Sequence, residues 1–287
     1  MKYLKGSLGG ISVILVLALS LLCAHWEKAS TNDGILVHVV DVGQADCIVI
    51  ETPDGNVMID TGTDISETSL RAYLRSNGLT EFDYLILSHP HDDHIGNADM
   101  MLTEFSIHQV VCAESNSEEA VWQNFLSVID QKSRTGETEW VKPVIGAVYW
   151  VGALRMEVLL APDAENDGEN NDSLIVRAEF GDCSMLFTGD AEAEEEDHLL
   201  ASVPAERLQV DWLKVGHHGS SSSTTQDFLQ VIRPRIAVIS AGSGNSFSHP
   251  HEELLQRLRT ADAEIYRTDL DGTLRFYCDG ERFSLLS

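Results

Sequence analysis

A short run rich in histidine constrains this chain more than any other feature of its sequence. It reads Ser-His-Pro-His-Asp-Asp-His-Ile-Gly and directly follows an apolar, strand-like segment, Tyr84–Leu87. Neutral imidazole and carboxylate groups are the preferred ligands of zinc and neighbouring divalent metals. Because six residues cannot wrap four donors around one ion without strain, the spacing predicts that the four donors are divided between two ions. We expect His89 and His91 on one metal ion. Asp93 and His94 would then serve a second ion.

Two carboxylates also come directly after apolar, strand-like runs. Asp60 ends Val57–Ile59, where it would either orient the histidines as a hydrogen-bond partner or cap the turn. Asp190 follows Met185–Gly189. At that point a carboxylate can bridge two metal ions, act as the N-cap of the next helix, or do both.

Two pairs of histidines complete the set of metal-ligand groups. His217 and His218 follow the apolar run Leu213–Gly216, and adjacent residues on an extended segment point to opposite sides. We therefore expect one of them to be a metal ligand and the other to contact substrate or solvent. His249 and His251 lie in a later loop, where a single histidine is readily explained as a loop residue. Seven of the 11 histidines fall in three such clusters, which favours a functional origin.

The first thirty or so residues differ from the rest of the chain. Lys2 and Lys5 precede an almost uncharged apolar run, Gly9–Trp26, the pattern of a secretory signal peptide or a membrane anchor. We favour an uncleaved anchor, because the candidate cleavage points lack a small residue three positions upstream. The lysines before the apolar run predict an extracytoplasmic location for the residues after it. We divide the chain into this segment with a short linker, residues 1–33, and one domain, residues 34–287.

The net charge of −27 and the five cysteines limit the partners that this chain would suit. Such a surface repels polyanions at long range, and a protein that grips duplex DNA normally shows a basic stripe. A generic acidic secreted enzyme has the same composition. The cysteines show no C-x-x-C spacing, so a thiolate zinc site is not expected. An oxidising compartment would allow one disulfide among the four cysteines beyond the N-terminal segment.

Strand-like runs and helices alternate in both halves of the chain. Helical periodicity predicts five helices, over residues 66–76, 118–131, 191–201, 224–231 and 252–260. Two hairpins are predicted, one over 173–188 with its turn at Gly181-Asp182 and one over 272–286 with its turn at Asp279-Gly280. With no internal repeat or linker, this pattern predicts two sheets covered by helices.

The motif series resembles that of the metallo-β-lactamase superfamily. Three motifs carry the resemblance, namely Asp60-x-Gly62, His89-x-His91-x-Asp93-His94 and Thr188-Gly189-Asp190. A closer resemblance is to the hydrolase domain of ComEC-type competence proteins, and it covers the chain from Ile35 onward. The stretches that carry it are Asp41–Asp46, Asn171–Leu174, Lys214–Ser220, His249-Pro250 and Thr268–Gly272. The resemblance implies an α/β fold, an αββα sandwich of two mixed sheets flanked by helices, with a dinuclear site at one sheet edge.

The resemblance also implies roles for individual residues. Asp190 would bridge two divalent ions, zinc or manganese, and either His217 or His218 would complete the second ion. The two ions would lower the pKa of a shared water toward about 7, producing hydroxide near neutral pH. Asp93 would belong to the catalytic centre. The spare histidine of the pair, or His249, would protonate the leaving oxygen or bind a phosphate oxygen.

One position departs from the pattern of the superfamily. Its usual histidine between the histidine run and the bridging aspartate is missing, and the only histidine in that interval is His108, inside an apolar segment. Asn171, Asp172 and Ser173 occupy that place, as they do in the ComEC-type group. We therefore expect the ion held by the first two histidines of the run to have few ligands, or to borrow Asp172 or another donor.

Together these features predict an extracytoplasmic, metal-dependent hydrolase of phosphodiesters, with single-stranded nucleic acid as the substrate that the resemblance favours. One alternative is a small or envelope choline-phosphate ester, which suits the acidic charge. The other is a non-catalytic accessory protein of DNA uptake that binds DNA without cutting it. A lactamase is not expected from this motif set. The N-terminal segment is the expected membrane contact, and no protein partner is evident.

Overall fold

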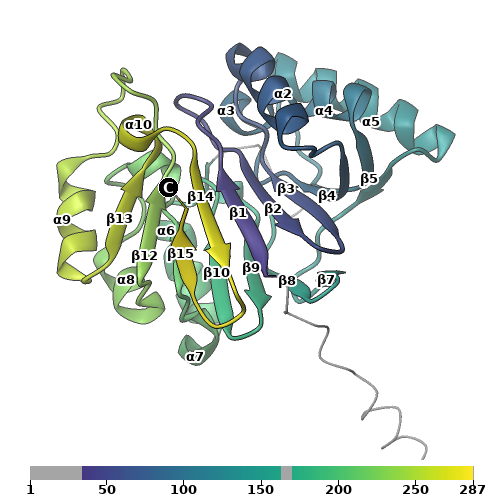
Figure 1. The fold of residues 1–287 in the computed structure, drawn as a ribbon. Coiled ribbons are helices and arrows are strands. Elements are labelled where there is room, and N and C mark those ends of the chain that lie inside the picture. Colours follow the sequence, from purple (N-terminus) through teal and green to yellow (C-terminus); the bar gives the residue numbers. More distant parts are fainter. Residues whose placement is uncertain (1–33, 163–169, 287) are drawn as a thin grey trace, which may run out of the picture. The chain divides into compact units, whose positions relative to one another are not determined.

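Two mixed β-sheets form the centre of the molecule (Figure 1). A computed structural model describes residues 34–162 and 170–286. The first sheet consists of β1 (Ile35–Val39), β2 (Ile48–Thr52), β3 (Gly55–Ile59), β4 (Glu81–Ile86), β5 (Ser106–Val111), β6 (Glu139–Val141), β14 (Leu274–Cys278) and β15 (Phe283–Leu285). The second consists of β7 (Val148–Val151), β8 (Leu154–Leu160), β9 (Ile175–Phe180), β10 (Cys183–Phe187), β11 (Trp212–Lys214), β12 (Ile236–Ile239) and β13 (Glu264–Arg267).

Strand direction decides where the polar residues gather. The strands of the first sheet are ordered β15-β14-β1-β2-β3-β4-β5-β6, and those of the second β13-β12-β11-β10-β9-β8-β7. Strands β3 to β6 run parallel to one another, as do β10 to β13. Parallel strands finish at the same edge of a sheet, so residues just beyond their carboxyl ends lie together.

Alternation along the strands creates the layer between the sheets. In β1, Ile35, Val37 and Val39 pack into this central cluster, whereas His38, on the opposite face, contacts Tyr73 of an outer helix. A period of two is the geometric consequence of a pleated strand with one face toward each layer. The central cluster also takes apolar side chains from strands of the second sheet.

Helices cover the outer face of each sheet. On the first sheet they are α2 (Glu67–Ser76), α3 (Asp92–Ile95), α4 (Ala98–Glu104) and α5 (Ala120–Thr135), and on the second α6 (Ala193–Ser202), α7 (Ala205–Leu208), α8 (Gln226–Ile232) and α9 (Glu252–Thr260). The short helix α10 (Thr268–Asp271) follows β13, and three 3-10 turns are η1 (Asp64–Ser66), η2 (Asn170–Asp172) and η3 (His217–Gly219). The predicted αββα sandwich is confirmed.

All five predicted helices and both hairpins occur, with ends shifted by a few residues at most of them. Strand β6 and helices α3 and α4 were not predicted, because three to seven residues are too few to show a clear period. The four described cysteines are buried free thiols: Cys47, Cys112, Cys183 and Cys278. The predicted anchor or signal peptide and most of the acidic loop before η2 lie outside the described residues. Across the described ranges, no helix is both long and apolar enough to cross a membrane.

Candidate metal centre

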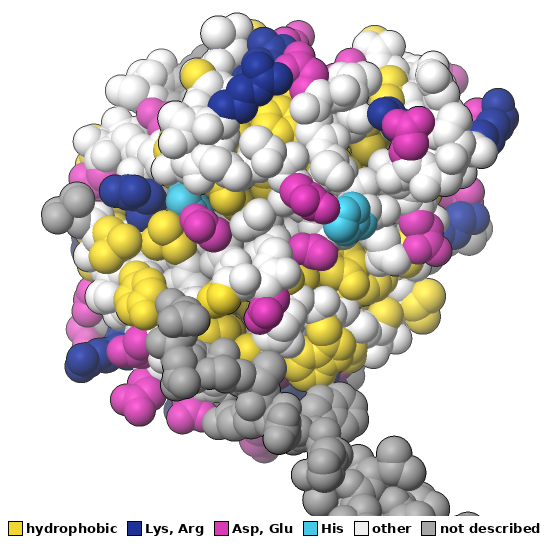
Figure 2. Space-filling view, turned by 45° about the vertical axis from the view of Figure 1, so that its right-hand side comes forward, with side chains coloured by type: hydrophobic (Ala, Val, Ile, Leu, Met, Phe, Trp, Pro, Cys, Tyr) yellow, Lys and Arg dark blue, Asp and Glu magenta, His cyan; other side chains and the backbone are white. Residues whose placement is uncertain are grey.

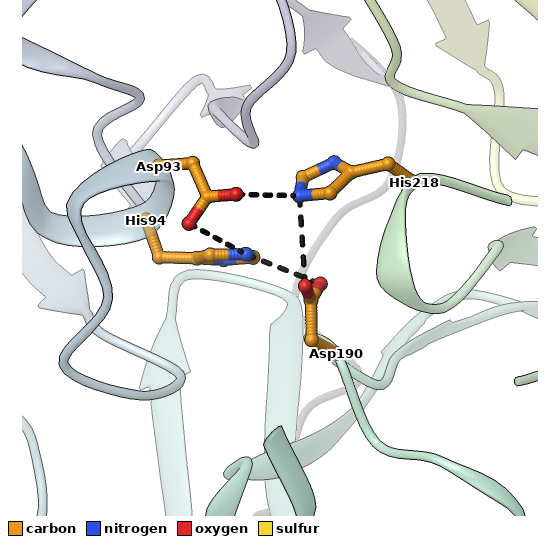
Figure 3. Close-up of side chains that lie close together, drawn as sticks. All are labelled: Asp93, His94, Asp190 and His218. Carbon is orange, nitrogen blue, oxygen red and sulfur yellow. Dashed lines mark hydrogen bonds and ion pairs between the residues drawn. The ribbon is translucent and has the colours of Figure 1, made fainter. Parts of the chain in front are cut away.

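Four ligand-type side chains converge where the carboxyl ends of both sheets meet (Figure 3). Asp93 and His94 come from α3 behind β4, Asp190 follows β10, and His218 follows β11. His94 Nε2 lies 3.1 Å from Asp190 Oδ1, and His218 Nε2 lies 3.2 Å from Asp93 Oδ2. The second oxygen of Asp190 lies 3.6 Å from His218 Nε2. Asp190 therefore faces both histidines, one with each carboxylate oxygen.

The donors of this cluster fit a divalent cation. One ligand atom from each of the four residues lies within 4.8 Å of all the others. Although His94 Nε2 and Asp190 Oδ1 are buried and only 3.1 Å apart, neither makes a well-directed hydrogen bond. Buried polar atoms normally have a hydrogen-bond or metal partner. A divalent cation bound to both atoms would supply that partner. Imidazole nitrogen and carboxylate oxygen are suitable ligands for zinc or manganese.

Without a metal, protons balance the charge of this cluster. Burial disfavours the charged forms of His94 and His218, but the surrounding carboxylates outweigh it and raise both pKa values, that of His218 to about 10. Burial also opposes ionisation of Asp93, yet His218 and His94 lower its pKa to about 2. The same two histidines lower the pKa of Asp190 well below its ordinary value against the effect of burial. Positive charge is thus required among these carboxylates.

Asp60 contacts the ring nitrogen of His94 that does not face Asp190. Its Oδ2 lies 2.8 Å from His94 Nδ1, and its Oδ1 accepts a 2.8 Å hydrogen bond from the backbone N–H of Ser88. Asp60 has φ +56°, a left-handed conformation that costs a non-glycine residue energy and is typical of functional sites. With a metal bound at Nε2, this contact would keep the remaining proton of His94 on Nδ1.

A left-handed turn separates the two adjacent histidines. His217 and His218 have φ +46° and +50° within η3, so the extended segment assumed from the sequence is wrong here. The turn sends His218 into the cluster at 2% exposure. His217 stays half-buried, with Nδ1 3.1 Å from Glu192 Oε1 and Nε2 3.7 Å from Asp190 Oδ2. The sequence left open which of the two histidines joins the cluster, and in the structure it is His218.

Close backbone packing positions Asp190. Gly189 has φ +52°, and a Cβ added there would lie 2.9 Å from both Ser173 Oγ and Ser88 Cβ. Ser173 Oγ in turn accepts a 3.0 Å hydrogen bond from the backbone N–H of Asp190. Helix α6 begins only at Ala193, after an N-cap at Glu192. The N-cap role considered for Asp190 is therefore wrong, and its carboxylate points into the cluster.

Comparison with known proteins agrees with this geometry. The family model of the metallo-beta-lactamase superfamily matches residues 40–243. The chain belongs to this superfamily. It is 33% identical over 258 residues to ComE operon protein 3 of Bacillus subtilis (strain 168), covering 84% of this chain and 32% of that protein. It is 28% identical over 268 residues to Competence protein ComA of Neisseria gonorrhoeae, covering 93% of this chain and 36% of that protein. The chain thus spans about a third of the length of these curated relatives.

Solved structures share the fold at low sequence identity. The metallo-beta-lactamase fold protein YhfI from Bacillus subtilis is 12% identical with a TM-score of 0.54, covering 81% of this chain and 96% of that chain. CmlA, a diiron beta-hydroxylase from Streptomyces venezuelae, is 13% identical with a TM-score of 0.53, covering 88% of this chain and 54% of that chain. The predicted resemblance to the superfamily and to ComEC-type competence proteins is confirmed.

The first two histidines of the superfamily motif lie beside the cluster as a separate pair. His89 Nε2 lies 2.9 Å from His91 Nδ1, close to the spacing of about 3.3 Å that two nitrogens on one tetrahedral zinc would have. Burial lowers the pKa of His89 well below its ordinary value. Within the described residues, neither histidine belongs to a group of three or more potential ligands.

Two of the residues at the place of the missing superfamily histidine, Ser173 and Asn171, support the surrounding structure. Ser173 Oγ lies 3.5 Å from His89 Nδ1, and Asn171 Oδ1 accepts a 2.9 Å hydrogen bond from the backbone N–H of Glu192. Asp172 ends the turn η2. His108 is half exposed and lies 2.8 Å from Glu81 at the start of β4, at the opposite end of the strand from the cluster. His108 therefore does not replace the missing ligand.

The sequence alone assigned no role to a buried ion pair beneath the centre. Lys214 Nζ lies 2.7 Å from Asp46 Oδ2, and both side chains are 1% exposed. The other oxygen of Asp46 lies 3.4 Å from His218 Nδ1, which is also 3.1 Å from the carbonyl oxygen of Ser240. Asp46, Asp60 and His94 also lie close together, but Lys214 already neutralises Asp46. In the sequence, a lysine at the end of the apolar strand β11 indicates a buried cation but does not identify its partner.

Proposed function

We propose that this protein is a metal-dependent phosphodiester hydrolase. The observation that carries the proposal is the convergence of Asp93, His94, Asp190 and His218, with His94 Nε2 and Asp190 Oδ1 buried and unsatisfied. When bound, divalent ions supply Lewis acidity that activates water and offsets the charge developing on a phosphoryl group. Zinc is the ion we favour for this donor set, and manganese is the alternative.

The remaining polar residues at this edge suit substrate contacts. His249 is half-buried, and its ring centroid lies 5.6 Å from that of His217. Burial and the neighbouring histidines lower the pKa of His249 to about 4, so its ring is neutral at pH 7. A neutral imidazole offers one hydrogen-bond donor and one acceptor. We infer that His249 binds a substrate oxygen through this donor, and that His217 faces the leaving group.

We propose single-stranded nucleic acid as the substrate, in an extracytoplasmic compartment reached through the apolar N-terminal segment. Similarity to competence proteins supports this choice. On the face shown in Figure 2, lysine and arginine side chains form small separate groups with acidic side chains between them. No continuous basic stripe crosses that face, and the net charge of −27 gives the protein little long-range attraction to a long duplex, which favours a short or flexible strand.

Hydrolysis of bis-p-nitrophenyl phosphate by the purified protein tests the proposal. We expect turnover with Zn²⁺ or Mn²⁺, loss of turnover after chelation, and a loss of at least about 100-fold in Asp190→Asn and His94→Gln. His108→Gln is the matched control, because it removes a half-exposed histidine far from the cluster. Equal activity in His94→Gln and His108→Gln would contradict the proposal.

The alternatives predict different outcomes of the same assays. A choline-phosphate hydrolase would cleave glycerophosphocholine faster than an oligonucleotide. An accessory protein of DNA uptake would bind an oligonucleotide without cleaving either substrate, at every metal tested. Similarity to the competence proteins is the observation that supports this second alternative.

A further inference from the structure

The most exposed apolar side chains lie in the connections that follow strands at the same sheet edges as the metal centre. Among the described residues, the four highest exposures of large apolar side chains are 91%, 70%, 64% and 63%, at Ile65, Leu270, Val144 and Phe247. Each follows the carboxyl end of one of the parallel strands, β3, β13, β6 and β12 respectively. An exposed apolar side chain beside a catalytic edge is a candidate contact for an apolar part of the substrate.

Phe247 differs from the other three because a chain of rings connects it to the centre. Its ring centroid lies 5.7 Å from that of His249, with an interplanar angle of 32°. The His249 ring lies 5.6 Å from His217, whose Nε2 is 3.7 Å from Asp190 Oδ2. Phe247 is thus two rings away from the carboxylate that faces both histidines of the cluster.

The loop that carries Phe247 is held by its own hydrogen bonds. Asn245 Oδ1 accepts hydrogen bonds from the backbone N–H groups of Phe247 (3.1 Å) and His249 (3.0 Å). Asn245 Nδ2 donates to the carbonyl oxygen of Gly242 at 2.9 Å. Gln44 anchors the same loop from the other sheet, because its Oε1 accepts from the backbone N–H of Gly242 at 3.0 Å. The backbone that carries the exposed ring is therefore held in place before any substrate arrives, which lowers the entropic cost of ordering this loop on binding.

We propose that Phe247 is a specificity residue that stacks on an unpaired nucleobase of the substrate. This inference rests on the proposed phosphodiester hydrolysis and narrows its substrate to base-bearing strands. Stacking uses the neutral face of a base, so it suits a chain whose net charge of −27 gives little long-range attraction to phosphates. Quaternary ammonium groups are instead typically recognised by cages of several aromatic rings. Phe247 and His249 instead form a single tilted ring contact, with an interplanar angle of 32° and centroids 5.7 Å apart.

The test compares a thymidine decamer with a decamer of the same length that lacks all bases. We expect the Mn²⁺-loaded full chain to prefer the thymidine decamer in kcat/KM by about 5- to 150-fold, the range of a single stacking contact. Phe247→Ala should bring that ratio close to one, and Phe247→Trp should keep it. Trp150→Ala is the control, because it removes an exposed aromatic side chain from β7, the edge strand of the second sheet, which carries none of the candidate contacts.

Each outcome decides the inference separately from the proposed function. An unchanged ratio in Phe247→Ala overturns the stacking role while hydrolysis stands. If the wild type cleaves neither decamer, equilibrium binding of both decamers is measured by calorimetry. A Phe247-dependent preference in binding then supports stacking although the proposed hydrolysis fails, and its absence overturns both. A Phe247-dependent gain for glycerophosphocholine and not for the thymidine decamer also overturns the inference.

Discussion

Removing the buried cation beneath the metal centre should destabilise the fold strongly. Lys214→Met keeps most of the side-chain volume but leaves the carboxylate of Asp46, 1% exposed, without the ammonium that lies 2.7 Å away. Breaking one partner of a buried ion pair costs about 3–5 kcal/mol, because the other charge remains buried and uncompensated. Lys214 also donates a 2.8 Å hydrogen bond to the carbonyl oxygen of Val215, which the variant loses.

Urea unfolding in the presence of a chelator measures this cost without interference from metal binding. With an m-value of about 3 kcal/mol per molar, a loss of about 4 kcal/mol lowers the midpoint by roughly 1.3 M. Arg259→Met is the control, since it breaks the half-exposed pair with Glu252 and should leave the midpoint unchanged.

The double variant Lys214→Met/Asp46→Asn separates charge from packing. Removing both charges should restore at least half of the lost free energy of unfolding, because no unpaired ion remains. A Lys214→Met midpoint equal to that of the surface control would refute the reasoning. A double variant no more stable than the single one would refute it as well.

The remaining predictions concern metal binding and one buried histidine. Asp60→Asn should weaken Zn²⁺ or Mn²⁺ binding by roughly 10- to 100-fold in a chelator competition, because His94 loses the carboxylate that holds its Nδ1; unchanged affinity would remove Asp60 from this role. Metal binding at pH 8 should release about two protons, one each from His94 and His218, because carboxylates raise both pKa values against burial, that of His218 to about 10. Affinity should therefore rise with pH, and calorimetry in buffers of different ionisation enthalpy that detects no proton release would contradict this. Burial lowers the pKa of His38 below its ordinary value of 6.5, so the unfolded chain binds the proton first and the native state loses stability as pH falls below 6.5. His38→Gln should flatten this loss between pH 7 and 5, and a pH profile identical to the wild type would contradict that assignment.

Several parts of the fold and the centre were predictable from local patterns. Apolar runs that end in Asp60, the histidine run and Asp190 have strand periods, and parallel strands place the residues beyond their carboxyl ends at one edge. Helix α9 was predicted to the residue, because its apolar face repeats clearly between His251 and Ala261. Ligand-type side chains placed directly after a strand can therefore be recognised in the sequence.

Short elements and buried charges were not predictable in the same way. Helices α3 and α4 are too short to show a period, and strand β6 has three residues. Asp46 and Lys214 are 168 positions apart in the chain, and nothing local indicates that they pair. An ion pair between distant residues exists only after the two sheets have packed.

The sequence by itself determined the ligand types, their order after the strands and the sandwich that brings them together. Tertiary structure alone decided that His218 rather than His217 enters the cluster, because two consecutive left-handed residues turn the His218 ring into it and leave the His217 ring half-buried beside Glu192. It also decided that Asp190 faces the ligands rather than capping α6, and that Asp46 supports His218 from the first sheet. Local patterns report what each segment prefers, whereas the direction of a buried side chain depends on neighbours that only packing supplies.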